Sequence, residues 1–429
     1  MKRIFNIILA ALMILGSAAC SSANQQAEQK GFEPKLDKAA ECKINVAGSY
    51  GNFEALEAEF DRFNEYYPNV EMSYTKLDDY ENSLATVLEG NDAPNIFFSF
   101  SWMTGNPAYD EVFAHMENLA DDTLGLDLDC IRPGLLNRDS QGRVLTVPIF
   151  STSYGMLINN DLFEKEGLKV PVTLRELIDV CASFREKGYE SPMMGYSEKP
   201  SSCFMNTVVY LGFAGTLAEH PEMVAPANEC DPAAGEYMRP ALEVLSQLID
   251  KGCVNLEKCD EISDNYAEVI MRFFEGDVPM MICTADTVSG TGKRESQSEA
   301  FIAHPFSYTF APIPTTDKGG YFLDTPSVQF SVNSSCDNLD MTNEFMRFII
   351  SKTELNQMAS VKRLIAPLND LSFDKVYAPL DDVASDLIVS PTALGIEDTL
   401  AVQVRLASYR VGRGTLTIDE AVAKYGSLE

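Results

Sequence analysis

The sequence predicts an α/β protein of two lobes, each a mixed sheet flanked by helices. Three observations support this prediction. The chain has 429 residues, which is long for a single domain. Its N-terminal part alternates strand and helix patterns. A later stretch, residues 144–166, joins two apolar runs through a short polar patch with one aromatic ring. Such a stretch suits a crossing between lobes, although a strand, turn and strand within one domain has the same local pattern.

The alternation begins at residues 43–48, a short apolar strand. A helix follows and ends before Pro68, then residues 70–74 alternate as a half-buried strand. A second helix ends at Gly90, and residues 96–98 form a buried strand. The order β-α-β-α-β is typical of an open parallel or mixed sheet. The buried face of the first helix is predicted to consist of Phe53, Leu56, Phe60, Phe63 and Tyr67.

The rest of the chain repeats these signals. Strands are predicted at residues 279–283 and 329–332, and a helix with Tyr266, Ile270 and Phe273 on one face precedes the first of them. Because no linker-like stretch separates the two lobes, we expect their segments to be interleaved. Helix starts are marked by capping boxes at residues 173–176, 351–354 and 417–420.

The N-terminus predicts export. Lys2 and Arg3 precede an apolar run and small residues, so residues 1–19 are interpreted as a signal peptide, too short to span a membrane. Cys20 directly follows, as in the lipobox of bacterial lipoproteins, although Ser17 stands where an aliphatic residue is usual. Cys20 is therefore the predicted lipidation site, and residues 20–40 are a flexible tether. The alternative is a plain signal peptide with a chance cysteine.

The charge and the cysteines exclude several classes of protein. The formal net charge of −31 argues against nucleic-acid binding, which needs a basic face. No Cys or His cluster indicates a metal site, and nothing in the sequence indicates a cofactor. Cys253 and Cys259 lie close enough in sequence to close a small loop, but both being free is equally compatible with the pattern.

Five segments, taken in order, resemble a known family. They are FEALEAEFDRFNEYYPNVEMSY (53–74), GNDAPNIFFSF (90–100), VPIFSTSYGMLINNDLFEKEGLKVPVTLRELIDVC (147–181), FFEGDVPMMIC (273–283) and GRGTLTIDEAVAKY (412–425). Their order and spacing are similar to those of the family 1 extracellular solute-binding proteins of bacterial ABC importers, the branch of the maltose-binding proteins. Asn95 departs from the usual aspartate of the second segment.

The resemblance implies a periplasmic-binding-protein type II-like fold with crossings near residues 148–154, 282–286 and 328–334. The N-terminal lobe would hold residues 41–150 and 285–328, and the C-terminal lobe residues 151–284 and 329–429. The implied protein is a monomer without catalytic activity. Anchored outside the cell membrane by its lipid, it closes on a carbohydrate and delivers it to permease subunits.

Ligands of open α/β sheets bind beyond the carboxyl ends of the strands, so polar and aromatic residues just after the apolar runs are candidates. Rings suit the C–H faces of a sugar, and hydroxyls, amides and carboxylates suit its hydroxyls. Trp102, the single tryptophan, is the main candidate for stacking, with a core anchor as the alternative; Asn52 has the alternative of capping the helix after it. The predicted ligand-binding residues are Tyr50, Asn52, Ser99, Ser101, Trp102, Ser153, Tyr154, Tyr196, Glu198, Thr284 and Asp286.

Two other classes of function stay open. The same fold binds peptides, polyamines or metal chelates in other proteins, and the acidic balance permits a cationic ligand. An exported hydrolase acting on glycosides would use paired carboxylates, but their number here makes any pair uninformative. GxSxG and HExxH motifs are absent from the sequence. Residues 290–293, GTGK, lack the following Ser or Thr of a phosphate loop, because Arg294 stands there.

Overall fold

The structure, a computed structural model, describes residues 31–103, 107–370 and 373–428. The chain divides into an N-terminal segment, residues 1–35, and one compact unit, residues 36–429, and the described helices and strands all lie in the second. Cys20 and the predicted signal peptide lie outside the described residues, as does the side chain of Trp102. Among the described residues, none of the helices combines the length and the apolar character that crossing a membrane requires.

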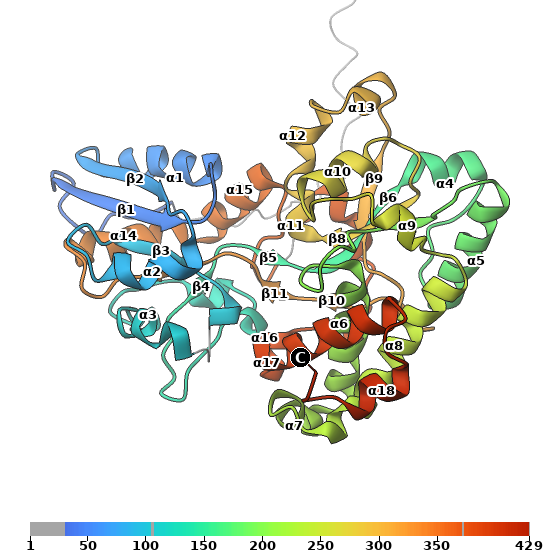
Figure 1. The fold of residues 1–429 in the computed structure, drawn as a ribbon. Coiled ribbons are helices and arrows are strands. Elements are labelled where there is room, and N and C mark those ends of the chain that lie inside the picture. The colour runs from blue at the N-terminus through green and yellow to red at the C-terminus, as the bar shows by residue number, and fades with distance from the viewer. Residues whose placement is uncertain (1–30, 104–106, 371–372, 429) are drawn as a thin grey trace, which may run out of the picture. The chain divides into compact units, whose positions relative to one another are not determined.

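The first sheet has five strands, β1 (Cys42–Gly48), β2 (Val70–Lys76), β3 (Ile96–Ser99), β4 (Val147–Pro148) and β12 (Gln329–Val332). Their order is β2-β1-β3-β12-β4. The parallel pairing of β1 with β2 and β3 confirms the predicted alternation (Figure 1). Strand β12 runs antiparallel to β3 and β4. The helices of this first lobe are α1 (Glu54–Asn64), α2 (Tyr80–Leu88), α3 (Asp110–Ala114), α14 (Leu339–Ile349) and α15 (Lys352–Lys362).

The second sheet has four strands, β6 (Tyr154–Asn159), β7 (Met193–Met194), β8 (Met280–Thr284) and β9 (Tyr308–Ala311), in the order β7-β8-β6-β9. β6 is antiparallel to both β8 and β9, and β7 is parallel to β8. The helices of this second lobe are α4 (Asn160–Glu166), α5 (Leu174–Glu186), α6 (Phe204–Glu219), α7 (Val224–Asn228), α8 (Gly235–Asp250), α9 (Leu256–Cys259), α10 (Ala267–Phe273), α11 (Ala285–Val288), α12 (Thr291–Glu295), α13 (Glu299–Ala303), α16 (Pro391–Leu394), α17 (Asp398–Gly412) and α18 (Ile418–Ala423).

The pairing of β9 and β12 differs from the expected division of the chain. Residues 285–328 were expected in the first lobe, but β9 joins the second sheet beside β6. Residues 329–429 were expected in the second lobe, but β12 joins the first sheet beside β3 and β4. The reason is that residues 282–286 are not a crossing, because β8 leads into α11 and the chain returns through β9 to its own sheet.

Three segments connect the two sheets. The first runs from β4 through β5 (Ser151–Thr152) to β6, close to the expected position. The second runs through β11 (Thr325–Pro326) to β12, and β5 and β11 pair antiparallel where the two segments pass each other. The third follows α15, and Ile365 bridges to Ser151. This third crossing takes the place of the one expected at residues 282–286.

Short elements fill the remaining connections. β10 (Phe322–Leu323) pairs in parallel with β13 (Ile388–Val389) next to the second crossing. Turns of 3-10 helix lie at Ser101–Met103, Pro107–Tyr109, Leu128–Cys130, Pro133–Leu135, Pro221–Met223, Pro232–Ala234, Lys375–Leu380 and Ser385–Leu387.

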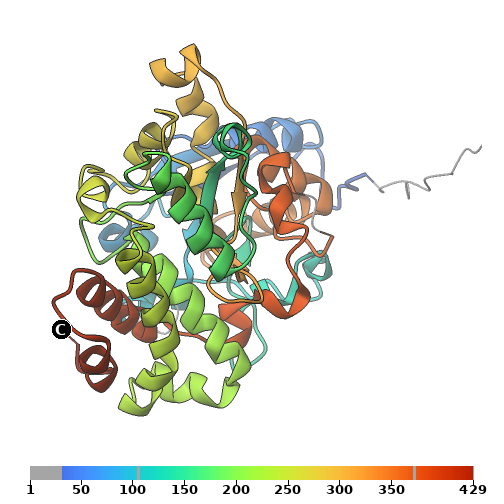
Figure 2. The ribbon, with the colours of Figure 1, turned by 90° about the vertical axis from the view of Figure 1, so that its right-hand side faces the viewer.

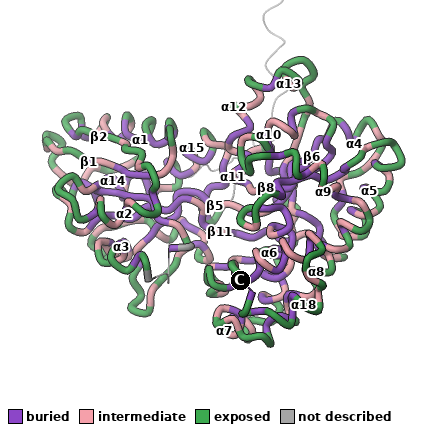
Figure 3. Tube along the Cα trace, in the orientation of Figure 1, coloured by how far each residue is buried: buried purple, intermediate pink, exposed green. Residues whose placement is uncertain are grey.

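Burial follows the strands and the crossings (Figure 3). The predicted face of α1 is confirmed, because Phe53, Leu56, Phe60, Phe63 and Tyr67 are all buried. Helix α6 is buried on several sides, since α8 and α17 pack against it (Figure 2). The cysteines of the described residues are all free, Cys253 and Cys259 included.

The helix caps follow the sequence with one exception. The capping boxes of Thr173 with Glu176 and of Thr417 with Glu420 are formed in full, as predicted. At α15 the Ser351 hydroxyl accepts a hydrogen bond from the Glu354 backbone, but the Glu354 carboxylate pairs with Arg62 of α1 instead of returning to the cap. Packing of α15 on α1 therefore overrides the local motif.

Candidate functional site

A cavity of about 1370 Å³ lies between the ends of strands from both sheets. The first lobe contributes residues that follow β1, among them Ser49, Tyr50 and Asn52. The second lobe contributes residues at the ends of β7 and β8, and faces of α6, α10, α12 and α17. The position agrees with the rule that open α/β sheets bind ligands beyond the carboxyl ends of their strands.

Five tyrosines line this cavity: Tyr50, Tyr154, Tyr196, Tyr210 and Tyr266. The Tyr154 and Tyr210 rings pack edge to face, with centroids 5.6 Å apart and an interplanar angle of 72°. Tyr266, at the start of α10, is the most open ring, with 37% of its surface exposed. Such rings provide flat apolar surfaces beside hydroxyl groups, which suits a ligand with both apolar faces and polar edges.

Asp286 follows β8, on α11, and lines the cavity. Its carboxylate accepts a hydrogen bond of 2.6 Å from the Ser327 hydroxyl, so it also ties α11 to the second crossing. Although the side chain is half-buried by area, it lies deep in the protein, and desolvation raises the pKa of this carboxyl above its usual value. Asp286 is placed to accept hydrogen bonds from a ligand.

Two further polar groups of the wall are among those buried without a hydrogen-bond partner in the described part of the chain. They are the amide oxygen of Asn206, on α6, and the hydroxyl of Thr325, on β11. A buried polar group without a partner costs about 1–3 kcal/mol.

The charged residues of the wall differ in their pairing. Arg405 pairs with Asp398 at 3.3 Å on α17, and Arg363 pairs with Glu295 at 2.9 Å. Lys362 and Arg294 instead lie over aromatic rings: the Lys362 ammonium is 5.8 Å from the Tyr50 centroid, and the Arg294 guanidinium is 5.2 Å from the Tyr266 centroid. Within the described part of the chain, neither forms an ion pair with a carboxylate.

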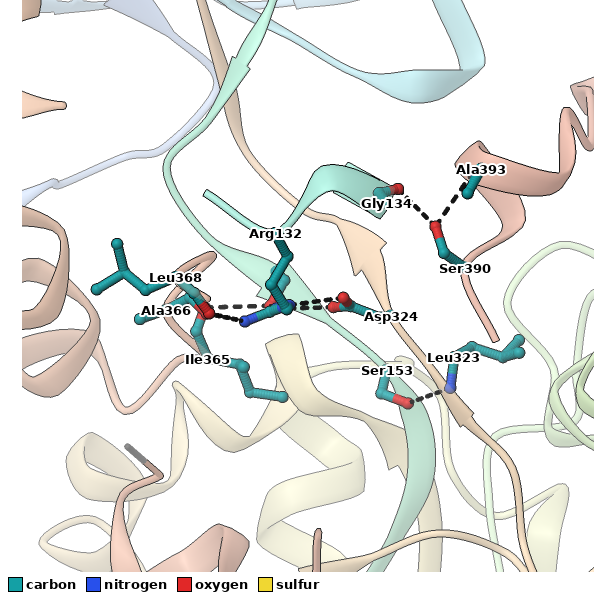
Figure 4. A network of polar contacts seen from close by, with 11 residues as sticks. Arg132, Gly134, Ser153, Leu323, Asp324, Ile365, Ala366, Leu368, Ser390 and Ala393 are labelled. Atoms are coloured by element: carbon teal, nitrogen blue, oxygen red, sulfur yellow. Dashed lines mark hydrogen bonds and ion pairs between the residues drawn. The ribbon is translucent and has the colours of Figure 1, made fainter. Parts of the chain in front are cut away.

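The crossings behind the cavity are joined by Arg132 (Figure 4). Its guanidinium donates to both carboxylate oxygens of Asp324, at 2.6 and 2.7 Å. It also donates to the Ser151 hydroxyl and to the carbonyls of Ala366 and Leu368. Because Ser151, Asp324 and residues 366–368 belong to three different connecting segments, one side chain holds all three together.

The cavity brings together most of the predicted ligand-binding residues, namely Tyr50, Asn52, Ser101, Tyr154, Tyr196, Thr284 and Asp286. Asn52 does not cap α1, whose N-cap residue is Phe53; its side-chain amide donates to Glu54 instead. Tyr196 is largely buried, and its hydroxyl donates to Glu198.

Three predicted residues do not line the cavity. Ser99 is buried in the first sheet, where its hydroxyl pairs with Ser331 at 2.8 Å. Ser153 is buried in the first crossing, and its hydroxyl accepts from the Leu323 backbone. Glu198 is exposed outside the cavity wall. Both side chains face inward, Ser99 at the end of β3 and Ser153 between β5 and β6, which a count of residues after an apolar run does not reveal. The side chain of Trp102 lies outside the described residues.

Other cavity residues were missed. Asn206 and Tyr210 are one helical turn apart on the otherwise apolar α6, and this polar pair on an apolar helix was the available signal. Tyr266 was predicted on a core face, but it stands at the N-cap of α10 and faces outward. Lys362 and Arg294 had no local signal, because only packing brings the end of α15 to α12.

Residues 47–212 match the model of a known family, the bacterial extracellular solute-binding proteins. The matched segment runs from β1 into α6 and includes the first crossing and part of the cavity wall.

Among characterised relatives, the melibiose/raffinose/stachyose-binding protein MelE of Bacillus subtilis is 25% identical over 188 residues. That match spans 44% of this chain and 41% of the relative, so less than half of either protein is compared.

Solved structures match nearly the whole fold. The apo form of RafE from Streptococcus pneumoniae has a TM-score of 0.69 at 15% identity, covering 91% of this chain and 97% of RafE. The GacH receptor of Streptomyces glaucescens, solved unliganded and with acarbose, has a TM-score of 0.65 at 18% identity, covering 90% and 97%. At such identities the likeness concerns the fold, which is the two-lobed periplasmic-binding-protein type that the sequence predicts.

Proposed function

We propose that this protein is the solute-binding component of an ABC importer and captures a carbohydrate in the cavity between its lobes. It binds and releases its ligand without chemical change and delivers it to permease subunits. The proposal requires no metal or cofactor. Carbohydrate is also the ligand class of the relatives, since MelE is named for melibiose, raffinose and stachyose, and RafE has been solved with raffinose.

The observation that carries the proposal is the combination of tyrosine rings and uncharged hydrogen-bonding groups on one cavity wall. Tyr154, Tyr210 and Tyr266 offer apolar faces, and Asn206 and Thr325 offer buried polar atoms without partners. A sugar has apolar C–H faces and an equator of hydroxyls, so it can use both sets together. Tyr50, Asn52, Ser101, Tyr196, Thr284 and Asp286 complete the proposed site.

Closure of the lobes is proposed to bend the three connecting segments that Arg132 holds together. Hinges of this kind involve a few residues at the ends of secondary-structure elements. The proposed hinge residues are those around Ser151, Asp324 and Ile365, where β5, β11 and the segment after α15 meet. The proposed lobes follow the two sheets, with β12, α14 and α15 assigned to the first lobe and β9 to the second.

The proposal places the protein outside the cytoplasm as a monomer, attached to the cell membrane through lipid on Cys20. Support comes from the sequence of the first twenty residues and from the extracellular family whose model residues 47–212 match. Replacement of Cys20 by alanine is expected to move the protein from the membrane fraction to the soluble fraction, which fractionation and immunoblotting measure. An unchanged distribution would contradict the anchor.

The carbohydrate proposal is tested with purified full-length protein by calorimetric titration and thermal unfolding against mono- and oligosaccharides, beginning with raffinose and stachyose. A ligand that binds only the folded state raises the melting temperature, and the rise grows with the logarithm of the ligand concentration above the Kd. Tyr266→Ala is expected to weaken binding by about tenfold, because stacking of a sugar face on an open aromatic side chain is worth ~1 kcal/mol or more. The matched control is Tyr237→Ala, on α8 outside the cavity.

Saturable binding of a carbohydrate, weakened by Tyr266→Ala and not by Tyr237→Ala, supports the proposal. No binding to any sugar, with a response to peptides or polyamines, would overturn the carbohydrate assignment. Release of monosaccharide from an oligosaccharide during the titration would overturn the non-enzymatic role.

A further inference from the structure

One end of the cavity, formed by α12 and the C-terminal end of α15, is rich in cations. Lys293 and Arg294 are on α12, and Lys362 is the last residue of α15. All three line the cavity, and within the described part of the chain none forms an ion pair with a carboxylate. This group of positive charges contrasts with the chain as a whole, whose formal net charge is −31.

The two lobes each contribute one cation held over a tyrosine ring. In the first lobe the Lys362 ammonium lies 5.8 Å from the centroid of Tyr50. In the second lobe the Arg294 guanidinium lies 5.2 Å from the centroid of Tyr266, whose hydroxyl also pairs with Ser289 at 3.1 Å. A ring face stabilises a nearby cation but does not neutralise it. Both charges therefore stay available to an anion.

The two pairs lie at the same end of the cavity. Arg363, next to Lys362, donates to the Thr291 hydroxyl at 3.2 Å, and Thr291 begins α12. Its guanidinium lies so close to Gly292 that a Cβ there would stand 3.3 Å from the Arg363 Cζ. Tyr50, Tyr266 and Asp286 all line the same cavity. Burial is the main cause that raises the pKa of Tyr50 above its usual value, and Asp286 and Tyr266 add to the shift.

The acids that line the cavity do not cancel this charge. Asp398 pairs with Arg405, and it lies with Glu397 at the α17 end. Glu54 is exposed at the start of α1 and accepts a hydrogen bond from Asn52. Asp286, at the start of α11, accepts a hydrogen bond from the Ser327 hydroxyl. The wall is therefore polarised, with free cations at the α12 and α15 end.

We propose that the carbohydrate of this site is acidic, with a carboxylate or sulfate group bound between Lys362 of the first lobe and Arg294 of the second. Lys293 adds positive charge beside Arg294. Arginine and lysine bind such groups through charge-assisted hydrogen bonds, which are stronger than neutral ones. Because the anion contacts both lobes, it also favours the closed arrangement. This inference rests on the carbohydrate-binding function proposed above and narrows its substrate class.

The test compares three matched ligands by calorimetry at low ionic strength with the full-length protein. They are a galacturonate oligosaccharide, its carboxyl-reduced neutral counterpart and a sulfated disaccharide. We expect the uronate to bind at least tenfold more tightly than the neutral counterpart. Arg294→Gln and Lys362→Gln should each weaken uronate binding about tenfold and leave binding of the neutral sugar within twofold. Added salt should weaken only the anionic ligands.

The matched control is Lys318→Gln, which removes one exposed positive charge outside the cavity. It should leave all affinities unchanged, so that a general effect of net charge is excluded. Tighter binding of the sulfated ligand than of the uronate, with the same sensitivity to both variants, supports the site and identifies the anion as sulfate.

Three results separate failure of this inference from failure of the proposed function. If neutral sugars bind as tightly as acidic ones, the function stands and the inference is overturned. If acidic sugars bind but neither variant weakens them, the anion site is elsewhere and the inference is again overturned. If no carbohydrate binds, the proposed function itself fails.

Discussion

Arg132 in the crossings and Arg294 in the cavity show two opposite uses of the same side chain. The Arg132 guanidinium has Asp324, Ser151 and two carbonyls as partners, and only 12% of its side chain is exposed. Arg294 has the face of Tyr266 and no carboxylate among the described residues. Since a buried charge is tolerated only when it is paired, the first arginine is structural. The second keeps its hydrogen-bonding capacity for a ligand.

The largest effect is expected from Arg132→Gln. It leaves the buried Asp324 carboxylate without its partner, and breaking a buried ion pair costs about 3–5 kcal/mol of unfolding free energy. Urea denaturation at neutral pH measures the loss. The control is Arg143→Gln, which removes an exposed pair with Asp139 and should cost less than about 1 kcal/mol. Equal losses from the two variants would mean that the Arg132 network does not stabilise the crossings.

A smaller effect is expected at Glu59, which pairs with Arg62 of its own helix. Arg62 has a second carboxylate partner, Glu354 of α15. Burial raises the pKa of Glu59 from 4.5 to about 7, and Arg62 lowers it only in part. A carboxyl whose folded pKa is raised contributes stability at low pH that is lost as the pH rises through the folded value. Wild-type stability should therefore fall between about pH 5 and pH 8 because Glu59 must ionise while buried.

Glu59→Gln removes that loss. We expect the variant to be more stable than the wild type by about 1–3 kcal/mol at pH 8, where one pKa unit corresponds to 1.36 kcal/mol, and the difference to vanish near pH 5. Thermal unfolding across this pH range measures it. Glu57→Gln, exposed on the same helix, is the control and should have no such pH dependence. A pH-independent difference for Glu59→Gln would contradict the raised pKa.

Asp286 is an intermediate case, since its carboxylate has a hydroxyl partner but no partner cation. Its raised pKa means that ionisation costs folding free energy as the pH rises above the ordinary value of 3.8. Asp286→Asn should raise the unfolding free energy of the unliganded protein by about 1 kcal/mol at pH 7 and weaken ligand binding about tenfold. The gain should shrink as the pH falls. Asp317→Asn, at an exposed position, is the control; loss of both stability and binding would show that Asp286 is mainly structural.

The sequence predicted the positions of the strands better than the sheets that they join. Strand β3 was found because it is a short apolar run, and β1 and β12 because polar and apolar residues alternate along them. The assignment of β9 and β12 to the wrong lobes has a physical cause: which sheet a strand joins depends on pairing across more than 100 residues of sequence, as between β12 and β3. The Arg132 network was not predicted for the same reason, because its partners lie 19 to 236 residues away.

The candidate site divides in the same way. Tyr50, Tyr154 and Asp286 were found because they follow strands, and strand ends meet the cavity. Ser99 and Ser153 satisfied the same rule but point into the protein, where neighbouring hydroxyl and amide groups use them. Lys362 and Arg294 come from helix ends and are brought together only by packing of α15 beside α12. No local pattern distinguishes such cations from solvated surface charges.

The smallest effect on stability is expected from the double variant Arg294→Gln, Lys362→Gln, and this prediction sharpens the contrast with Arg132. Each substitution removes only a cation–ring contact, worth about 0.5–1 kcal/mol at a partly exposed site, and leaves no buried carboxylate without its partner. The unfolding free energy should therefore change by less than about 1 kcal/mol in total, measured in the same urea experiment as for Arg132→Gln. A loss of several kcal/mol would place these cations with Arg132 as structural groups. A small loss of unfolding free energy would show that neither cation is needed for folding, as expected for charged groups that serve to bind a ligand.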